Sequence, residues 1–258
     1  MLLLRAWLTL VWLSFQRLLW SSTTFMVMFP LVGAALFLSR WRQRLTSATF
    51  GGDFQHSLIR FTDSFVILIF LSILLPICAL AFATASLGDE REERTLVFVL
   101  MRPIPRWLIL MAKLTATLPL VVGVVAGSFY GYCQLAGPVG REAFERYLPA
   151  VLCTTLAYVG LFQLFAVMFR HSTIAALVYA LFAEPLMAAM PGRINRLAIA
   201  YYGRSLIDHG IVAAGSRSTN WIVPVDSPTA VWTLLTIALG TLTLAAVIFQ
   251  RREYRDLT

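Results

Sequence analysis

Long apolar runs separated by short polar stretches constrain this chain more than any other feature of its sequence. A helix needs roughly 20 mostly apolar residues to cross the hydrocarbon core of a bilayer. Six runs approach or exceed that length, at about 22–39, 63–87, 108–135, 147–169, 173–190 and 229–249. Charged residues make up only 13% of the chain, about half the share usual in soluble proteins. The sequence therefore predicts an all-α, polytopic membrane protein of about six transmembrane helices, with 1–258 as a single transmembrane domain.

The residues before the first run, 1–20, have the pattern of an amphipathic helix. Arg5, Thr9 and Gln16 fall near one face, and leucines, Val11 and Phe15 lie largely on the other. Arg17 interrupts the apolar run, which argues against a secretory signal peptide. We therefore expect 1–20 to lie at the membrane interface and to lead into the first span.

The segment 88–107 is the most polar part of the chain and has an unusual order of residues. Acidic residues come first, as a helix N-terminus favours, then an apolar stretch that begins at Leu96, and then Arg102-Pro103. The residue before a proline disfavours helical geometry, so a short helix should end there. A simple connector between two spans needs none of these features. The pattern predicts a short helix that docks on a partner protein.

This segment resembles the cytoplasmic loop of ABC type-2 exporter permeases, the transmembrane subunits of ABC transporters. The resemblance lies in the stretch from Asp89 to Leu96, the Arg102-Pro103-Ile104-Pro105-Arg106-Trp107 turn and the downstream Lys113. One departure is Arg94, which stands where the family usually has glycine. The resemblance implies that both termini are cytoplasmic and that the segment transmits motion from an ATPase. The residues expected to do so are Glu90, Glu92, Glu93, Thr95, Leu96, Arg102, Pro103 and Arg106.

The same resemblance implies the partners and the setting of the protein. It implies a cytoplasmic ATP-binding subunit as partner, and export as the direction of transport. Six helices are too few to surround a sizeable path, and two-fold dimers are the commonest assemblies, so we expect a homodimer or a heterodimer with a sister permease. The protein is expected to be multi-pass in the cytoplasmic or inner membrane of a prokaryote, surrounded by lipid, and not itself an enzyme.

Orientation cannot be read from charge, although an excess of basic residues normally marks cytoplasmic loops. With cytoplasmic termini, eleven basic residues fall inside and ten outside. The mixed stretch 192–228 is too polar to span, and we expect it to be an extracytoplasmic loop with one or two short helices.

Two features inside the spans raise functional hypotheses. Glu184 lies within the fifth run beside Pro185, and an ionisable group at membrane depth is costly and often functional. It could line a substrate path or act as a gate, or it could make a structural hydrogen bond. Gly123, Gly127 and Gly131 recur every four residues, a spacing that allows close helix packing. Packing within the chain is the preferred interpretation, and a dimer seam or sliding face is the alternative.

Several classes of function find no support in the sequence. The chain has no glycine-rich phosphate-binding motif ending in lysine, and its three cysteines have no metal-ligand spacing, so we expect no cofactor and no metal. Ser205, Asp208 and His209 are too close together for a hydrolase triad on one helix. Basic residues sit at span ends, which argues against nucleic acid. A proton-coupled secondary transporter or channel without an ATPase, using Glu184, remains an alternative, as does a non-transporting membrane assembly.

Overall fold

The computed structural model describes residues 2–48, 54–92, 106–190, 194–213 and 225–251, and within these ranges every regular element is helical. The α-helices are α1 (Leu2–Leu19), α2 (Ser22–Ala48), α3 (Phe54–Phe61), α4 (Leu75–Glu92), α6 (Arg106–Ala136), α7 (Pro138–Met168), α8 (Ser172–Val178), α9 (Glu184–Ala189), α10 (Ile199–Ala213) and α11 (Ser227–Arg251). Two π-helical segments, η1 (Thr62–Leu74) and η2 (Tyr179–Ala183), and a 3₁₀ turn, η3 (Ile194–Leu197), complete them. The predicted all-α class is confirmed.

The apolar runs form helices of three kinds. Four helices are long and apolar enough to cross a membrane, namely Ser57–Gly88, Leu108–Ala136, Pro138–Met168 and Ser227–Arg251. A fifth crossing requires Val11–Leu19 and Thr24–Arg40 together, which meet at a bend of 52°. The fifth predicted run is a shorter apolar helix, Ser172–Ala188. The prediction of a polytopic membrane protein is confirmed, with four to five spans by length and composition.

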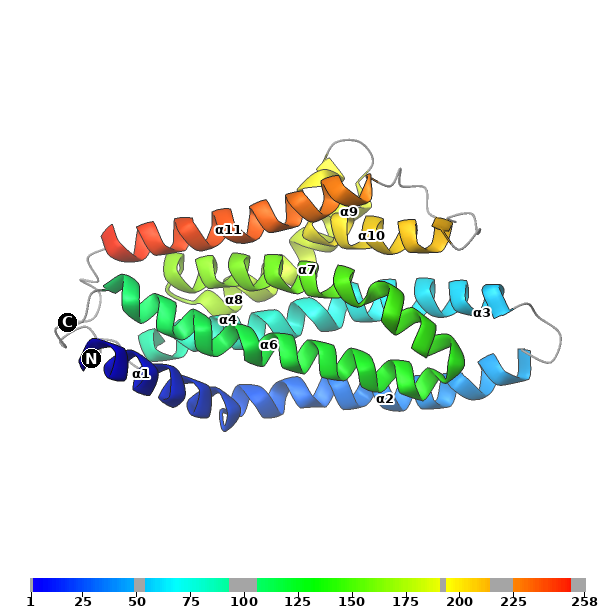
Figure 1. Cartoon of the computed structure of the whole chain (residues 1–258), viewed down its shortest axis with the longest axis horizontal. Helices are drawn as coiled ribbons and strands as arrows, with labels where there is room; N and C mark the ends of the chain where they lie inside the picture. The colour runs from blue at the N-terminus through cyan, green and yellow to red at the C-terminus, as the bar shows by residue number, and fades with distance from the viewer. Residues whose placement is uncertain (1, 49–53, 93–105, 191–193, 214–224, 252–258) are drawn as a thin grey trace.

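The helices run along a common long axis, so their ends gather at two ends of the bundle. α1 begins and α11 ends at the same end, where α4 also ends and α6 begins (Figure 1, left). α7 begins at the opposite end and packs against α4, α6, α10 and α11. The chain therefore leaves α4 and enters α6 at the same end of the bundle, where α1 begins and α11 ends.

Aromatic side chains fill the half of the core nearest the start of α7. Phe65 and Phe70 of η1 pack against Tyr132 of α6, and Phe70 also contacts Phe129. All four are almost completely buried. The Tyr132 hydroxyl donates a hydrogen bond to the backbone carbonyl of Leu31, 2.9 Å away on α2. The core thus joins α2, η1 and α6 through both packing and a buried polar contact.

α7 begins at Pro138, well before the fourth apolar run at about 147–169, so the polar stretch between the third and fourth runs is not a loop. Gly137 alone makes the turn, with φ of +78°, a conformation that glycine adopts readily and other residues rarely do. Pro138 suits the first helical position, where its missing N–H leaves no bond unmade. Gly140 lets the two helices touch, since a Cβ there would stand 2.0 Å from the backbone oxygen of Cys133. A one-residue turn therefore replaces the expected loop.

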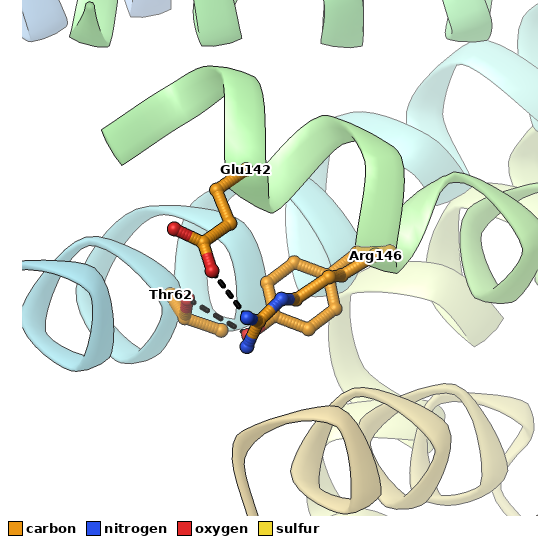
Figure 2. A network of polar contacts seen from close by, with 4 residues as sticks. Thr62, Glu142 and Arg146 are labelled. Atoms are coloured by element: carbon orange, nitrogen blue, oxygen red, sulfur yellow. Dashed lines mark hydrogen bonds and ion pairs between the residues drawn. The ribbon is translucent and has the colours of Figure 1, made fainter. Parts of the chain in front are cut away.

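The charged residues that suggested a loop lie instead on the first turns of α7. Arg146 and Glu142 form an ion pair four residues apart, and both side chains are partly exposed. Figure 2 shows this pair beside Thr62 of the neighbouring helix, whose hydroxyl lies 3.5 Å from that of the buried Tyr147. Pairing along an exposed helical face explains how these residues continue the helix. α2 likewise continues to Ala48 through basic residues that were expected to end it near residue 39.

Candidate functional site

The sequence singled out two places, the segment 88–107 and Glu184, and the structure describes Glu184 and the two ends of the segment, 88–92 and 106–107. Glu93, Thr95, Leu96, Arg102 and Pro103 lie outside the described residues. Glu90 and Glu92 belong to the end of α4, and Arg106 begins α6. The structure therefore describes the two helices that carry the segment.

The sequence pattern predicts that the acidic residues at 89–92 begin a new helix, and this prediction is wrong. α4 continues without a break through Gly88 to Glu92, so these residues occupy its C-terminal turns. Carboxylates at a helix C-terminus are mildly unfavourable because of the helix dipole, by a few tenths of a kcal/mol. Nothing in 75–92 breaks the helix, and the long apolar run before it keeps α4 packed in the bundle.

A buried polar contact joins α4 to α6 near this end. Lys113 of α6 is only 4% exposed, and its ammonium donates a hydrogen bond to the backbone carbonyl of Ser86, 2.6 Å away on α4. The Ser86 hydroxyl lies 2.8 Å from the carbonyl oxygen of Ala83 in its own helix and 3.2 Å from the amide oxygen of Gln163 on α7, so its one proton is shared between these two acceptors. Gln163 is fully buried. Three helices therefore meet at one polar cluster, formed by Lys113, Ser86 and Gln163.

The surroundings of this polar cluster combine buried leucines with a small cavity. Leu87, Leu110 and Leu114 pack with residues of α7 and α11 in a buried cluster. A cavity of about 20 Å³ is lined by Lys113 and Ser86 together with Ser14 and Arg17 of α1. A cavity of this volume can hold about one water molecule. The ammonium thus lies beside an apolar cluster and at a small cavity shared with α1.

Glu184 lies where the short apolar helix Ser172–Ala188 meets α7 and α10. Its side chain is 3% exposed. One carboxylate oxygen, Oε1, accepts hydrogen bonds from the Tyr158 hydroxyl on α7 and from the backbone N–H of Ala200, the latter at 2.9 Å. Ala200 is the second residue of α10, so the carboxylate caps the N-terminus of that helix, where a negative group is favoured. Glu184 therefore joins three helices through one oxygen.

The neighbourhood of Glu184 contains further buried polar groups and irregular helix. Among the residues that the structure describes, neither its second oxygen, Oε2, nor Nε of Arg204 has a hydrogen-bond partner. Arg204 donates to Ser72 in the π-helical segment η1, at 2.9 Å. The other π-helical segment, η2, ends immediately before Glu184. π-helical turns occur frequently at functional sites, and α10 contacts η1 directly and α9, which follows η2.

The glycine repeat of α6 packs against no other part of the chain that the structure describes, so the preferred interpretation is wrong there. Gly123, Gly127 and Gly131 are exposed, and a Cβ built on any of them would meet nothing within 4 Å. The close helix contact is made elsewhere, at Gly160 of α7, where a Cβ would stand 2.9 Å from the carbonyl oxygen of Ala238 on α11. The alternative interpretation of the repeat, a dimer seam or a sliding face, stays a prediction.

The structure gives the polar residues of α10 a role in anchoring the chain. The Ser205 hydroxyl accepts from the N–H of Val225 and donates to its carbonyl oxygen, which also lies 2.6 Å from Nε2 of His209. These contacts hold the start of α11 against α10 and occupy the groups that a hydrolase would need. Among the residues the structure describes, no group of three His, Cys, Asp or Glu side chains could hold a metal ion.

Sequence analysis missed the partners of the two buried charges. Tyr158 lies 26 residues from Glu184, and Ser86 lies 27 residues from Lys113. Both are ordinary residues within apolar runs, and nothing in their local sequence distinguishes them. One sequence signal could have pointed to these partners: a polar residue inside an apolar run, at about the membrane depth of a buried charge. Gln163 fits that description best.

The chain was compared with known proteins. A family model described as ABC-2 family transporter protein matches residues 16–207. The match spans α2 through most of α10 and includes both Glu184 and the segment 88–107. The comparison with curated proteins found no match.

Proposed function

The chain belongs to the ABC-2 family of transporter proteins and is a multi-pass transmembrane subunit of an ABC transporter, and we propose that it is an exporter permease energised by a separate cytoplasmic ATP-binding subunit. The single observation that carries this proposal is the family match over residues 16–207. The proposed setting is the cytoplasmic or inner membrane of a prokaryote. The permease itself would hydrolyse nothing and would need no cofactor.

The segment 88–107 is proposed as the contact with that ATPase. α4 and α6 pack against each other, and they end and begin at the same end of the bundle (Figure 1). The chain between them, 93–105, contains acidic residues, an apolar stretch and two prolines, a composition suited to docking on a protein surface. Motion of this segment would reach the membrane through two adjacent spans.

A dimer, formed with a second copy or with a sister permease, is proposed as the transporting unit. The described helices form one bundle with aromatic residues in its centre, which leaves no room for a sizeable substrate within one subunit. Symmetric pairing is the commonest way to build a path between subunits. Lipid would cover the remaining exposed apolar faces.

Glu184 is proposed as part of the substrate path or of a gate. Its carboxylate holds α10 to α7 next to the π-helical segment η2, so release of these hydrogen bonds would free α10. A carboxylate oxygen without a partner among the described residues also fits the alternative function, a proton-coupled carrier that needs no ATPase.

Co-purification in detergent with a candidate ATP-binding subunit tests the proposal. We expect the wild type to bind the ATPase and the double variant Glu92→Arg/Leu96→Asp to lose it. Glu145→Arg is a matched charge reversal on an exposed position at the opposite end of the bundle, and it should bind like the wild type. Failure of the wild type to bind any ATPase would refute the permease proposal and would favour the proton-coupled alternative.

A further inference from the structure

Lys113 is a buried charge on α6, seven residues after the start of that helix. It is the only lysine of the chain, and it lies in a membrane protein whose other basic residues are all arginines. Burial of an ammonium group carries a desolvation penalty of several kcal/mol, which close and well-aligned partners must offset. A buried ion is often replaceable by an apolar residue without loss of stability. Stability is therefore a weak reason for a lysine at this position.

The position of the contact gives a better reason. Ser86 precedes the end of α4 by six residues, and Lys113 follows the start of α6 by seven. At a rise of 1.5 Å per residue, the bond between them lies roughly 10 Å from the two helix ends that carry the segment 93–105. This hydrogen bond joins the end of α4 to the start of α6, about two helical turns inside the bundle.

The same turn of α4 is also tied to the helices behind it. The Ser86 hydroxyl lies 3.2 Å from the amide oxygen of Gln163 on α7. Two residues later, Gly88 touches the first residue of α8, since a Cβ on Gly88 would stand 2.4 Å from the hydroxyl oxygen of Ser172. The turn 85–88 thus contacts α6, α7 and α8. Movement of α4 at this level cannot occur without movement of its neighbours.

We propose that Lys113 is a positioning residue that makes the ends of α4 and α6 move as one body with α7. A push on the segment 93–105 then reaches the whole bundle, instead of bending one helix end. This inference rests on the proposed function, since it needs an ATPase that moves the segment. The ammonium suits the task because a hydrogen bond from a charged donor to a carbonyl is about twice as strong as a neutral one.

Lys113→Met tests the proposal, because methionine keeps the length of the side chain and removes its charge and donor. The complex with the ATPase is reconstituted in lipid, and ATP hydrolysis, ATPase binding and thermal unfolding are measured on the same samples. Thr117→Val is the matched control. Thr117 is fully buried one turn further along α6, and its hydroxyl bonds only within that helix as far as the described contacts go.

We expect Lys113→Met to bind the ATPase and to unfold at the temperature of the wild type or above. The permease-dependent change in ATPase rate should fall about tenfold, the factor on the order of one hydrogen bond to a charged group. Thr117→Val should keep the full change in rate. This separation between binding and rate would not arise from a merely structural lysine.

Three results would overturn the inference, and the third would also refute the proposed function. An unchanged ATPase response in Lys113→Met would remove the positioning role and leave the proposed function intact. A lower unfolding temperature together with lost ATPase binding would assign Lys113 to folding. A wild type that neither binds the ATPase nor alters its rate would refute the proposed function itself, and the positioning role with it.

Discussion

Removal of the Glu184 carboxylate should release the start of α10 from the bundle. Oε1 accepts from the Tyr158 hydroxyl and from the Ala200 N–H, and both donors are buried. Glu184→Ala leaves the two donors without an acceptor. Each unsatisfied buried donor costs about 1–3 kcal/mol, so the variant should lose roughly 2–6 kcal/mol of stability if the site does not relax. Tyr158→Phe removes one bond to the carboxylate without stranding a donor and should cost about 1.5–3 kcal/mol.

Hydrogen exchange measured by mass spectrometry on a peptide from the first turns of α10 is the most direct assay. A local loss of 1.4 kcal/mol corresponds to about tenfold faster exchange, so Glu184→Ala should accelerate exchange there at least that much. Peptides from the middle of α6 are the internal control, since Glu184 does not contact them in the described structure. Exchange at wild-type rates in α10, together with an unchanged unfolding temperature, would refute the capping role of Glu184.

Three further predictions concern packing and backbone geometry. Gly160→Ala should lower the unfolding temperature, because its Cβ would stand 2.9 Å from a backbone carbonyl oxygen of α11. Gly123→Ala is the control, since its Cβ would meet nothing within 4 Å. Equal effects of the two substitutions would contradict the observed packing. Gly137→Ala should cost about 1–3 kcal/mol, because a Cβ is strained at φ of +78°, and thermal unfolding in detergent would show it; a neutral result would mean that the turn has another conformation. Tyr132→Phe should cost about 1 kcal/mol by loss of the hydrogen bond to α2, measured in the same assay, and no loss would mean that this bond adds nothing.

Four or five of the six expected spans could be predicted, because hydrophobicity is a local property of the sequence. Each apolar run of the chain lies in a helix, and the predicted bounds of the third span, 108–135, differ from α6 by one or two residues. The beginning of α7 could not be predicted in this way. Its first turns carry Glu142 and Arg146, which resemble a loop in composition but pair with each other on the exposed face of a helix. Composition alone does not distinguish a polar loop from a polar helix end.

The candidate sites were predictable only in part. Glu184 and Lys113 stand out in the sequence because a charge in or next to an apolar run is rare. Their partners do not stand out, since Tyr158 and the carbonyl of Ser86 come from helices that only the tertiary fold brings near. The sequence likewise could not predict whether the glycine face of α6 packs within the chain. Helical periodicity shows that residues share a face but not what that face contacts.

The rate of ATP hydrolysis by the reconstituted complex tests the central claim most directly. The ATPase is measured alone, with the wild-type permease in lipid, and with Glu92→Arg/Leu96→Asp. If the chain is an ABC permease coupled through 88–107, the wild type changes the rate and the double variant does not. A rate that is the same with and without the wild-type permease would contradict that account.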